Sequence, residues 1–315
     1  MILFMDMAVL FSSLMGLFLL IGVGFFAVRA GLLPAEASKP LSTLLMKITL
    51  PATVLTSLLQ PFDPSFLVLG GWMFALGAVL VPLFALLSLV LSKVFRVPEG
   101  RRGMWCCTTT FFNNGFMGFP IALALFGEEG LTLTVIMSVP FTLLAYSVGA
   151  KMVCMDLPKG GASAPISWKK VIFSAVNLSM AIGLLLYFTQ IQLPDAIETP
   201  LVYLSNVTTP LSMLITGMNL SQGRVTDILK DRDVFASAGV RLLLFPLLAW
   251  GVMRSLPGIH PLVLGAALIN MSMPSLAAAA MLGEQYGGCT QLAARAIFLS
   301  SLLCLGTIPL IALLL

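Results

Sequence analysis

The sequence divides into ten apolar runs of about 20 residues each, joined by short polar connections. A helix needs about 20 mostly apolar residues to cross the hydrocarbon core of a bilayer. Lipid cannot satisfy free backbone groups, and β-barrel strands would be shorter and alternating, so the runs predict helices. The ten predicted transmembrane helices cover residues 7–28, 37–58, 66–91, 104–126, 131–153, 171–188, 197–218, 234–253, 261–282 and 292–314.

The composition agrees with burial in lipid rather than folding in water. Hydrophobic residues make up 59% of the chain and charged residues 10%, whereas soluble domains average roughly 45–50% and about 25%. We therefore expect an all-α membrane protein whose surroundings are the lipid bilayer. The five cysteines form no CxxC pair and lie near or inside apolar runs, which indicates inert thiols rather than disulfides or a zinc site. No motif predicts a metal or another cofactor.

Lys and Arg residues are unevenly distributed between the two sides of the predicted helices. With the N-terminus outside, the cytoplasmic connections hold 13 of them and the opposite connections hold only Arg254. Cytoplasmic loops carry the excess of positive residues, so we expect a multi-pass protein of the cell (cytoplasmic) membrane with both termini outside the cytoplasm. These residues form no basic face, which argues against a nucleic-acid partner.

The two halves of the chain resemble each other. Leu33-Pro34 and Pro40-Leu41 recur at a constant offset of 160, as Leu193-Pro194 and Pro200-Leu201. The pattern predicts a first five-helix repeat over 1–157, a cytoplasmic linker over 158–170 and a second five-helix repeat over 171–315. Five is an odd number, so the repeats must insert with opposite topology, which is typical of secondary transporters.

The fourth and ninth runs carry polar residues and a proline near their centres. Proline lacks an N–H and disrupts the preceding turn, so we expect both helices to break near Pro120 and Pro274. The N–H groups that follow, around Ile121 and Ser275, would then attract an anion at the membrane centre. The alternative is that each proline only kinks a packed helix. The polar residues that accompany the two prolines are Asn113, Asn114, Gly115, Asn270, Ser272 and Ser275.

Three cations fall within predicted spans: Lys47, Arg241 and Arg295. No Asp or Glu lies near a span centre, and charges inside a membrane are usually paired or functional. A bound anion could supply the missing charge, while the alternative is that these side chains reach the membrane interface. The absence of a central carboxylate weakens a proton-relay mechanism and leaves open a sodium site made from neutral oxygens.

Two motifs resemble those of the auxin efflux carrier family. They are Asn113-Asn114-Gly115-Phe116-Met117-Gly118-Phe119-Pro120, and Met273-Pro274-Ser275 followed by Gly283-Glu284-Gln285-Tyr286-Gly287-Gly288. The resemblance covers the whole chain and implies the fold shared by bile acid symporters and sodium/proton antiporters, with crossed broken helices 4 and 9. In that fold spans 1, 2, 6 and 7 form a scaffold, through which a homodimer could assemble, and spans 3–5 and 8–10 form a moving transport domain.

The family carries organic anions, including auxin and small carboxylates such as malate or malonate. This chain lacks a long central loop and resembles the compact microbial members. We therefore expect a secondary transporter that moves a small carboxylate by an elevator-type mechanism, with an anion channel or a non-transporting sensor as alternatives. No intramembrane catalytic motif is visible, so we expect no enzyme. The expected substrate-binding residues are Asn113, Asn114, Gly115, Pro120, Ile121, Arg241, Asn270, Ser272, Pro274 and Ser275.

Overall fold

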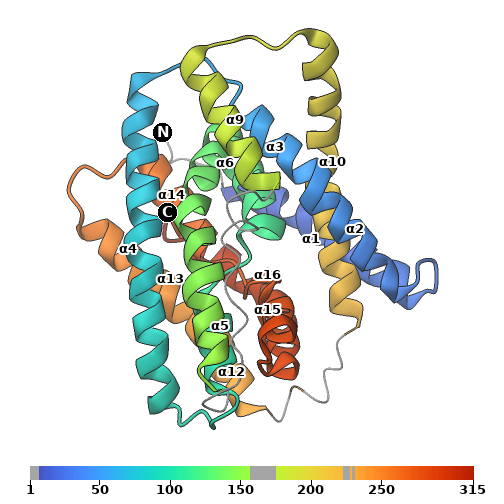
Figure 1. Ribbon diagram of the computed structural model, residues 1–315, viewed down its shortest axis with the longest axis vertical. Coiled ribbons are helices and arrows are strands. Elements are labelled where there is room, and N and C mark those ends of the chain that lie inside the picture. The colour runs from blue at the N-terminus through green and yellow to red at the C-terminus, as the bar shows by residue number, and fades with distance from the viewer. Residues whose placement is uncertain (1–6, 157–174, 223–227, 229–230) are drawn as a thin grey trace.

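The computed structural model describes residues 7–156, 175–222, 228 and 231–315, and within these ranges its regular structure is helical (Figure 1). The strand-like pairing in this part of the chain is an isolated antiparallel bridge between Phe112 and Ser275. The all-α prediction is therefore confirmed for the described residues. The predicted linker over 158–170 lies outside them.

The helices of the first half follow the first five apolar runs. Within α6, Gly127 has a positive φ of 66° and interrupts the helix where the sequence predicts the connection between the fourth and fifth spans. The segments are α1 (Met7–Arg29), η2 (Ala35–Ala37), α2 (Ser38–Leu44), η3 (Leu45–Thr49), α3 (Leu50–Ser57), α4 (Pro64–Val94), α5 (Arg102–Thr110), η4 (Asn114–Gly118), α6 (Phe119–Leu144), η5 (Ala145–Gly149) and α7 (Ala150–Cys154).

The second half also contains both continuous and interrupted helices. Its segments are α9 (Ala175–Thr189), α10 (Asp195–Ser221), α12 (Arg232–Gly239), η6 (Val240–Leu244), α13 (Phe245–Ser255), α14 (Pro261–Met271), α15 (Ala279–Tyr286) and α16 (Thr290–Ala312). The segments η3, η4, η5 and η6 are single π-helical turns between α-helices.

Four helical stretches of the described chain are long and apolar enough to cross a membrane, judged by length and composition. Shorter apolar helices accompany them, and α14 is one of these because the ninth run is interrupted. Together they indicate a multi-pass membrane protein, whereas the number of ten spans stays a prediction. The four stretches are Pro64–Val94, Asn114–Cys154, Arg232–Ser255 and Thr290–Ala312.

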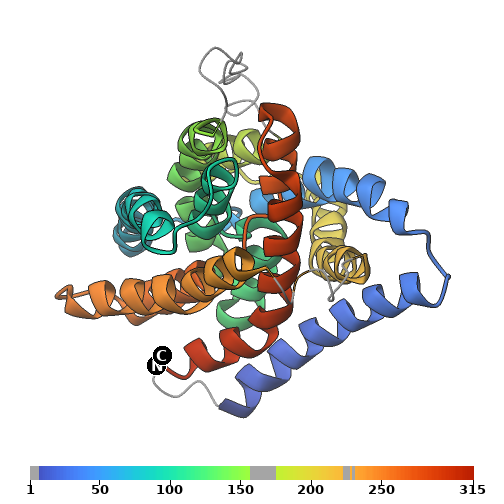
Figure 2. The same cartoon turned by 90° about the horizontal axis from the view of Figure 1, so that it is seen from below.

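One group of helices contains α1, α3, α9 and α10. In Figure 2 the blue α1 and α2 lie on the same side of the molecule as the yellow α10. α1 packs along α10, and α3 packs against both α9 and α10. A Cβ on Gly24 would collide with the Leu214 carbonyl, and one on Gly217 with the Ile21 carbonyl. These glycines therefore allow the close approach of α1 and α10, as small residues do between membrane helices.

A second group contains α4, α5, α6, α12, α13, α14 and α16. α4 packs along α6, α14 packs on α6, and α12 contacts both α5 and α16. The rings of Phe84 and Phe245 stack 4.4 Å apart in the core of this group. Three ion pairs join its helices: Arg101 with Asp231 and Asp233, and Arg295 with Asp231. The α4–α5 turn and α12, which carry most of these residues, lie at the lower end of Figure 1.

The two groups meet at a small apolar cluster. Leu50 and Val54 from α3 pack with Phe119 and Val135 from α6, and Met180 of α9 completes the contact. The division into a scaffold and a transport domain, and the relative movement of the two, stay predictions.

Candidate functional site

Both predicted interrupted helices are broken, and the two breaks touch. α5 ends at Thr110 and α14 ends at Met271, and the chain is non-helical until Asn114 and Ala279. The Leu276 N–H donates to the Phe111 carbonyl at 2.9 Å, and the Asn113 N–H donates to the Pro274 carbonyl at 2.7 Å. Unpaired backbone groups are costly away from water, so each break satisfies part of the other's backbone. We call this contact the crossing; it comprises residues 111–118 and 270–278 together with Arg241.

The position of the fourth-span break differs from the prediction. Pro120 is the second residue of α6, which continues directly from the π-turn that begins at Asn114. Ile121 therefore lies inside a continuous helical stretch, and its N–H does not open a half-helix. The break instead follows from the pairing of Phe111–Asn113 with the other break, which outweighs the local effect of the proline.

The first two N–H groups after Pro274, those of Ser275 and Leu276, are also not free for a ligand. The Ser275 N–H donates to the Ser300 hydroxyl at 3.0 Å, and the Leu276 N–H is used in the crossing. α15 begins only at Ala279. The backbone N–H groups of Ser275 and Leu276 are therefore already used by α16 and by the fourth span, whereas a contact between Ser275 and the substrate stays a prediction.

Arg241 connects the C-terminal ends of α5 and α14, the half-helices that precede the two breaks. It lies in the π-turn η6 and is fully buried. Its Nη1 donates to the Thr110 carbonyl at 2.8 Å and more weakly to Thr109 at 3.4 Å, and its Nη2 donates to the Met271 carbonyl. These carbonyls lie in the last turns of α5 and α14, and the last C=O groups of a helix have no partner within the helix itself. Arg241 therefore acts as a shared C-terminal cap.

Aromatic rings surround the guanidinium of Arg241. Its Cζ lies 5.2 Å from the ring centroid of Phe112, 5.5 Å from that of Phe245 and 5.9 Å from that of Phe84. Such faces attract cations in a desolvated environment. The described residues give Arg241 no acidic partner, so its charge is held by carbonyl dipoles and rings.

The three asparagines differ in what their side chains do. Asn113 caps the π-turn, since its Oδ1 accepts from the Phe116 N–H at 3.3 Å. Asn114 Oδ1 and Asn270 Oδ1 are buried and have no hydrogen-bond partner in the described part of the chain. The amide nitrogens of Asn113 and Asn114 likewise have no hydrogen-bond partner among these residues. The crossing thus holds amide groups with unused hydrogen-bonding capacity.

The two predicted serines also differ. The Ser272 hydroxyl donates to the Leu268 carbonyl at 2.7 Å and closes the last turn of α14. The Ser275 hydroxyl is buried and has no partner among the described residues. Ser275 is therefore available to a ligand, whereas Ser272 has a local structural role.

Arg295 and Lys47 do not join the crossing. Arg295 pairs with Asp231 at 2.9 Å, so its counter-charge comes from the protein. Burial raises the pKa of Asp231, but hydrogen bonds from Arg101 and Arg295 outweigh this effect and hold the pKa below its usual value. The expectation that a bound anion supplies the counter-charge of Arg295 therefore has no support here. Lys47 lies exposed on the π-turn η3.

Sequence reasoning missed three contributors to the crossing. Gly118 packs against Asn270 Oδ1, Ser300 binds the Ser275 N–H, and Met137 Sδ lies 3.6 Å from Asn270 Nδ2. Gly118 stood within the quoted motif and could have been recognised as a point of close backbone approach. Ser300 and Met137 lie in ordinary apolar runs, and nothing in their spacing identifies them.

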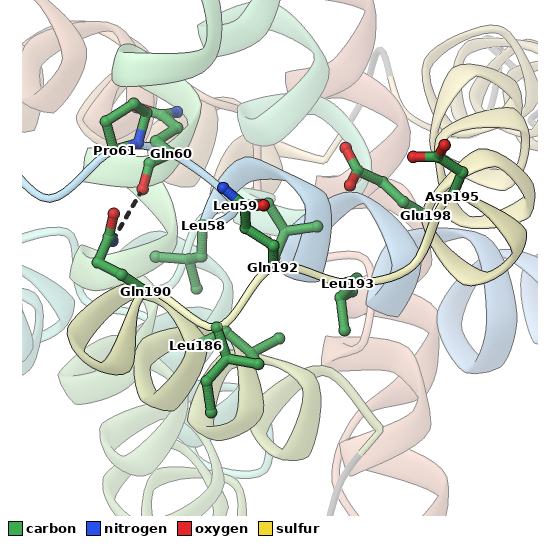
Figure 3. Close-up of a pocket in the computed structure, with 11 residues that line it drawn as sticks. Leu58, Leu59, Gln60, Pro61, Leu186, Gln190, Gln192, Leu193, Asp195 and Glu198 are labelled. Carbon is green, nitrogen blue, oxygen red and sulfur yellow. Dashed lines mark hydrogen bonds between the residues drawn. The ribbon is translucent and has the colours of Figure 1, made fainter.

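A cavity of about 330 Å³ lies away from the crossing residues, between the end of α3 and the α9–α10 connection (Figure 3). Asp195 and Glu198 face it from the first turn of α10. Negative side chains at this position stabilise the helix, because its N-terminus carries partial positive charge. The Gln190 side chain donates to the Gln60 carbonyl at 3.3 Å across its edge. None of its lining residues belongs to the crossing. They are Leu58, Leu59, Gln60, Pro61, Leu186, Gln190, Ile191, Gln192, Leu193, Asp195 and Glu198.

Irregular backbone inside a membrane protein is tolerated where it is buried in protein or lines a cavity, and paired discontinuous helices are typical of transporters. The apolar helices and the buried crossing thus define a multi-pass membrane protein of the transporter class.

The chain belongs to the membrane transport protein family, which is the auxin efflux carrier family. The family model described as Membrane transport protein matches residues 9–160 and 161–312. An uncharacterized transporter of Methanothermobacter thermautotrophicus is 27% identical over 308 residues, covering 95% of this chain and 96% of that protein. An uncharacterized transporter of Methanocaldococcus jannaschii is 27% identical over 290 residues, covering 90% and 91%. The resemblance found in the two motifs is confirmed.

Proposed function

We propose that this protein is a secondary transporter that moves a small organic anion, a carboxylate, across the cell membrane by an elevator-type alternating-access mechanism. Membership of a membrane transporter family supports the general activity. The charge balance at the crossing supports the choice of an anion.

The observation that carries this choice is the position of Arg241 between two helix ends. Each helix end is equivalent to roughly half an elementary charge, negative at the C-terminus and positive at the N-terminus. Four such ends meet at the crossing, and Arg241 caps the two negative ones, of α5 and α14. The positive ends of η4 and α15 have no acidic side chain in their first turns. The crossing therefore has an excess of positive potential that favours an anionic ligand.

Donors for a carboxylate are present at both positive ends. Among the described residues the N–H of Gly115 has no hydrogen-bond partner, and neither do the N–H groups of Ala277 and Ala278. All three positions are half-exposed, unlike the residues at the centre of the crossing. Amide nitrogens of Asn113 and Asn114 add donors without permanent charge. A carboxylate placed here would receive hydrogen bonds from both interrupted helices.

The distribution of polar contacts supports movement of one helix group against the other. The three ion pairs found in the described chain all lie within the group that carries the crossing. The contact between the groups contains the apolar cluster of Leu50, Phe119 and Met180. Apolar contacts are non-directional and roughly proportional to area, so they can be exchanged by sliding at lower cost than ion pairs. The Thr132 hydroxyl bond to the Ser57 carbonyl, at 2.6 Å, would break in such a movement.

Uptake into proteoliposomes tests the proposal. Purified protein should move labelled mono- or dicarboxylates at carrier rates, with saturation and with exchange against unlabelled carboxylate. Transport of only cations or neutral solutes would contradict the anion assignment. Single-channel currents would indicate a channel, and binding without flux would indicate a sensor.

The proposed orientation places both termini outside the cytoplasm, as the bias of positive residues predicts. Ile2→Cys and Leu315→Cys variants can be labelled in intact cells with an impermeant thiol reagent. The half-buried native cysteines Cys154 and Cys289 should first be replaced by Ser. Labelling that requires opening of the membrane would contradict this orientation.

A further inference from the structure

The cavity between the end of α3 and the α9–α10 connection has two chemically different ends. Figure 3 shows Asp195 and Glu198 at one end, Gln60 and Gln190 at the other, and leucines between them. The volume of about 330 Å³ lies within the range of small-molecule sites, roughly 300–1,000 Å³. The apolar residues of the lining are Leu58, Leu59, Pro61, Leu186, Ile191 and Leu193.

The protein itself uses the amide nitrogens of two lining glutamines. Gln60 Nε2 donates to the Ser57 carbonyl at 2.9 Å, and Gln190 Nε2 donates to the Tyr187 carbonyl at 2.6 Å. A backbone carbonyl cannot donate, so these bonds determine which atom of each amide is the nitrogen. Neither Oε1 atom accepts a hydrogen bond from a described residue. The free atoms of both amides are therefore acceptors.

Two carboxylates add further acceptors. Asp195 and Glu198 lie three residues apart in the first turn of α10, a spacing that brings side chains to the same face of a helix. Neither forms an ion pair with a described residue, and the residues that line the cavity include no Lys, Arg or His. The N-terminus of α10 contributes roughly half a positive elementary charge, which offsets only part of two carboxylates. The cavity therefore lacks a cationic hydrogen-bond donor.

We propose that this cavity binds a short aliphatic amine, with its primary ammonium group at Asp195 and Glu198. An ammonium has three donors and no acceptor, so it can donate to both carboxylates, and such charge-assisted hydrogen bonds are roughly twice as strong as neutral ones. The apolar lining suits a chain of a few carbons, and a second donor at the far end of this chain would meet the glutamine oxygens.

The same ammonium chemistry occurs in soluble amines and in the ethanolamine headgroup of a phospholipid. A headgroup would also bring a phosphate, which would meet two carboxylates and no cation in the lining. The charges therefore favour a soluble amine. The cavity shares no residue with the crossing, so the amine site is independent of the proposed carboxylate site.

Thermal unfolding of the purified protein in detergent tests the site. The hydrochloride of 4-amino-1-butanol is titrated against tetramethylammonium chloride at constant ionic strength, because tetramethylammonium carries the charge without an N–H donor. The Tm of wild type should rise with the amine and not with tetramethylammonium. Asp195→Asn and Glu198→Gln should each weaken the apparent affinity about tenfold, since each removes one charged partner. Glu36→Gln is the matched control, because Glu36 is an exposed acid in the first turn of η2 and does not line the cavity.

A wild-type Tm that does not respond to the amine, or that rises equally with tetramethylammonium, would overturn the inference. An undiminished response in Asp195→Asn and Glu198→Gln would do the same, and both substitutions keep the shape of a side chain that is not buried, so the variants should fold. Asn114→Ala should respond like wild type, whereas a lost response would place the amine at the crossing and overturn the assignment to the cavity.

Nanodiscs of phosphatidylglycerol with and without phosphatidylethanolamine distinguish the two sources of the ammonium group. An equal response to 4-amino-1-butanol in both would support a soluble amine. A response that phosphatidylethanolamine abolishes in wild type would overturn the soluble source and assign the cavity to a lipid headgroup.

Discussion

The break between α5 and η4 spans three residues, whereas the break between α14 and α15 spans seven. The shorter one is capped by Asn113 and followed by a π-turn that contains Asn114 and Gly118. The longer one contains Pro274 and small residues, and its half-helix α15 has no side-chain cap. The two breaks nevertheless exchange backbone hydrogen bonds with each other. The comparison shows that a proline is not required inside a break, whereas a backbone partner across the crossing is present in both.

The chemistry of the two breaks differs as well. The fourth span supplies two asparagines, a cap and the glycine beside which the amide oxygens meet. The ninth span supplies Asn270 before its break and free N–H groups after it. We therefore expect ligand selectivity to depend mainly on the fourth span, and the geometry of the crossing to depend on both.

The largest effect should come from the residue that both breaks share. Arg241→Met removes the donors of two helix ends, at roughly 1–3 kcal/mol for each buried carbonyl left unpaired, so the free energy of unfolding should fall by about 2–6 kcal/mol. Arg254→Met is the matched control, because Arg254 is exposed on α13, which continues from the π-turn η6 that carries Arg241. Unfolding in detergent provides the measurement. Equal stability of the two variants would show that Arg241 does not hold the crossing together.

Two asparagines of the fourth span should separate binding from capping. Asn114→Ala should weaken carboxylate binding by about 1–3 kcal/mol, because the substrate loses a partner. Asn113→Ala should lower stability by about 1 kcal/mol, because its oxygen caps the π-turn. Isothermal titration with the transported carboxylate and thermal unfolding measure the two effects. Full affinity in Asn114→Ala would contradict the proposed site.

The sequence predicted the features that depend on local composition. Runs of apolar residues located the helices, and prolines with polar neighbours predicted that the fourth and ninth runs are broken. That the two breaks cross was implied only by the family resemblance. The prediction for Pro120 was wrong because a local rule placed the break at the proline, while the pairing of Phe111 with Leu276 places it earlier. Such pairing joins residues more than 150 positions apart and leaves no pattern in a single sequence.

The same limit applies to the charged residues. Arg241 was expected to help bind the substrate, and its Nη1 and Nη2 donate to the carbonyls of Thr110 and Met271, a capping role that the sequence did not indicate. Arg295 was without a visible partner in the sequence because Asp231 lies outside the predicted spans. Both assignments required knowledge of which helix ends approach each other in space.

The two prolines should have unequal effects, which tests the first comparison directly. Pro274→Ala should destabilise by about 0.4–1 kcal/mol, since the proline reduces the freedom of the unfolded chain at a position where its conformation suits the break. Pro120→Ala should be neutral or stabilising, because an alanine restores an N–H and a favourable residue within a helix. Thermal unfolding and uptake rates measure both. A loss of transport in Pro120→Ala alone would mean that the proline controls the break.

A last, similarly small effect concerns how the fourth span begins. Arg101, just before α5, is held by Asp231, whereas α14 begins with a His260 cap on the Leu262 N–H at 3.2 Å. The lowered pKa of Asp231 means that its ion pairs stabilise the fold above the unfolded value of about 3.9, and that this stability is lost as pH falls through the lower folded pKa. Asp231→Asn should therefore cost about 1 kcal/mol at pH 7, the range of partly exposed ion pairs.

The difference in stability between wild type and Asp231→Asn should stay constant from pH 7 to about 5 and shrink below about pH 4, where Asp231 becomes protonated in the unfolded chain. Unfolding measured over this pH series checks the prediction, with Glu99→Gln as a control at an exposed acid of the α4–α5 turn, which carries Arg101. Arg101 and Arg295 share one carboxylate from different helices, so Asp231 joins the start of the fourth span to the start of α16. A difference that persists undiminished at pH 3 would mean that the substitution acts through packing rather than charge, and that the fourth span does not depend on an ionic anchor.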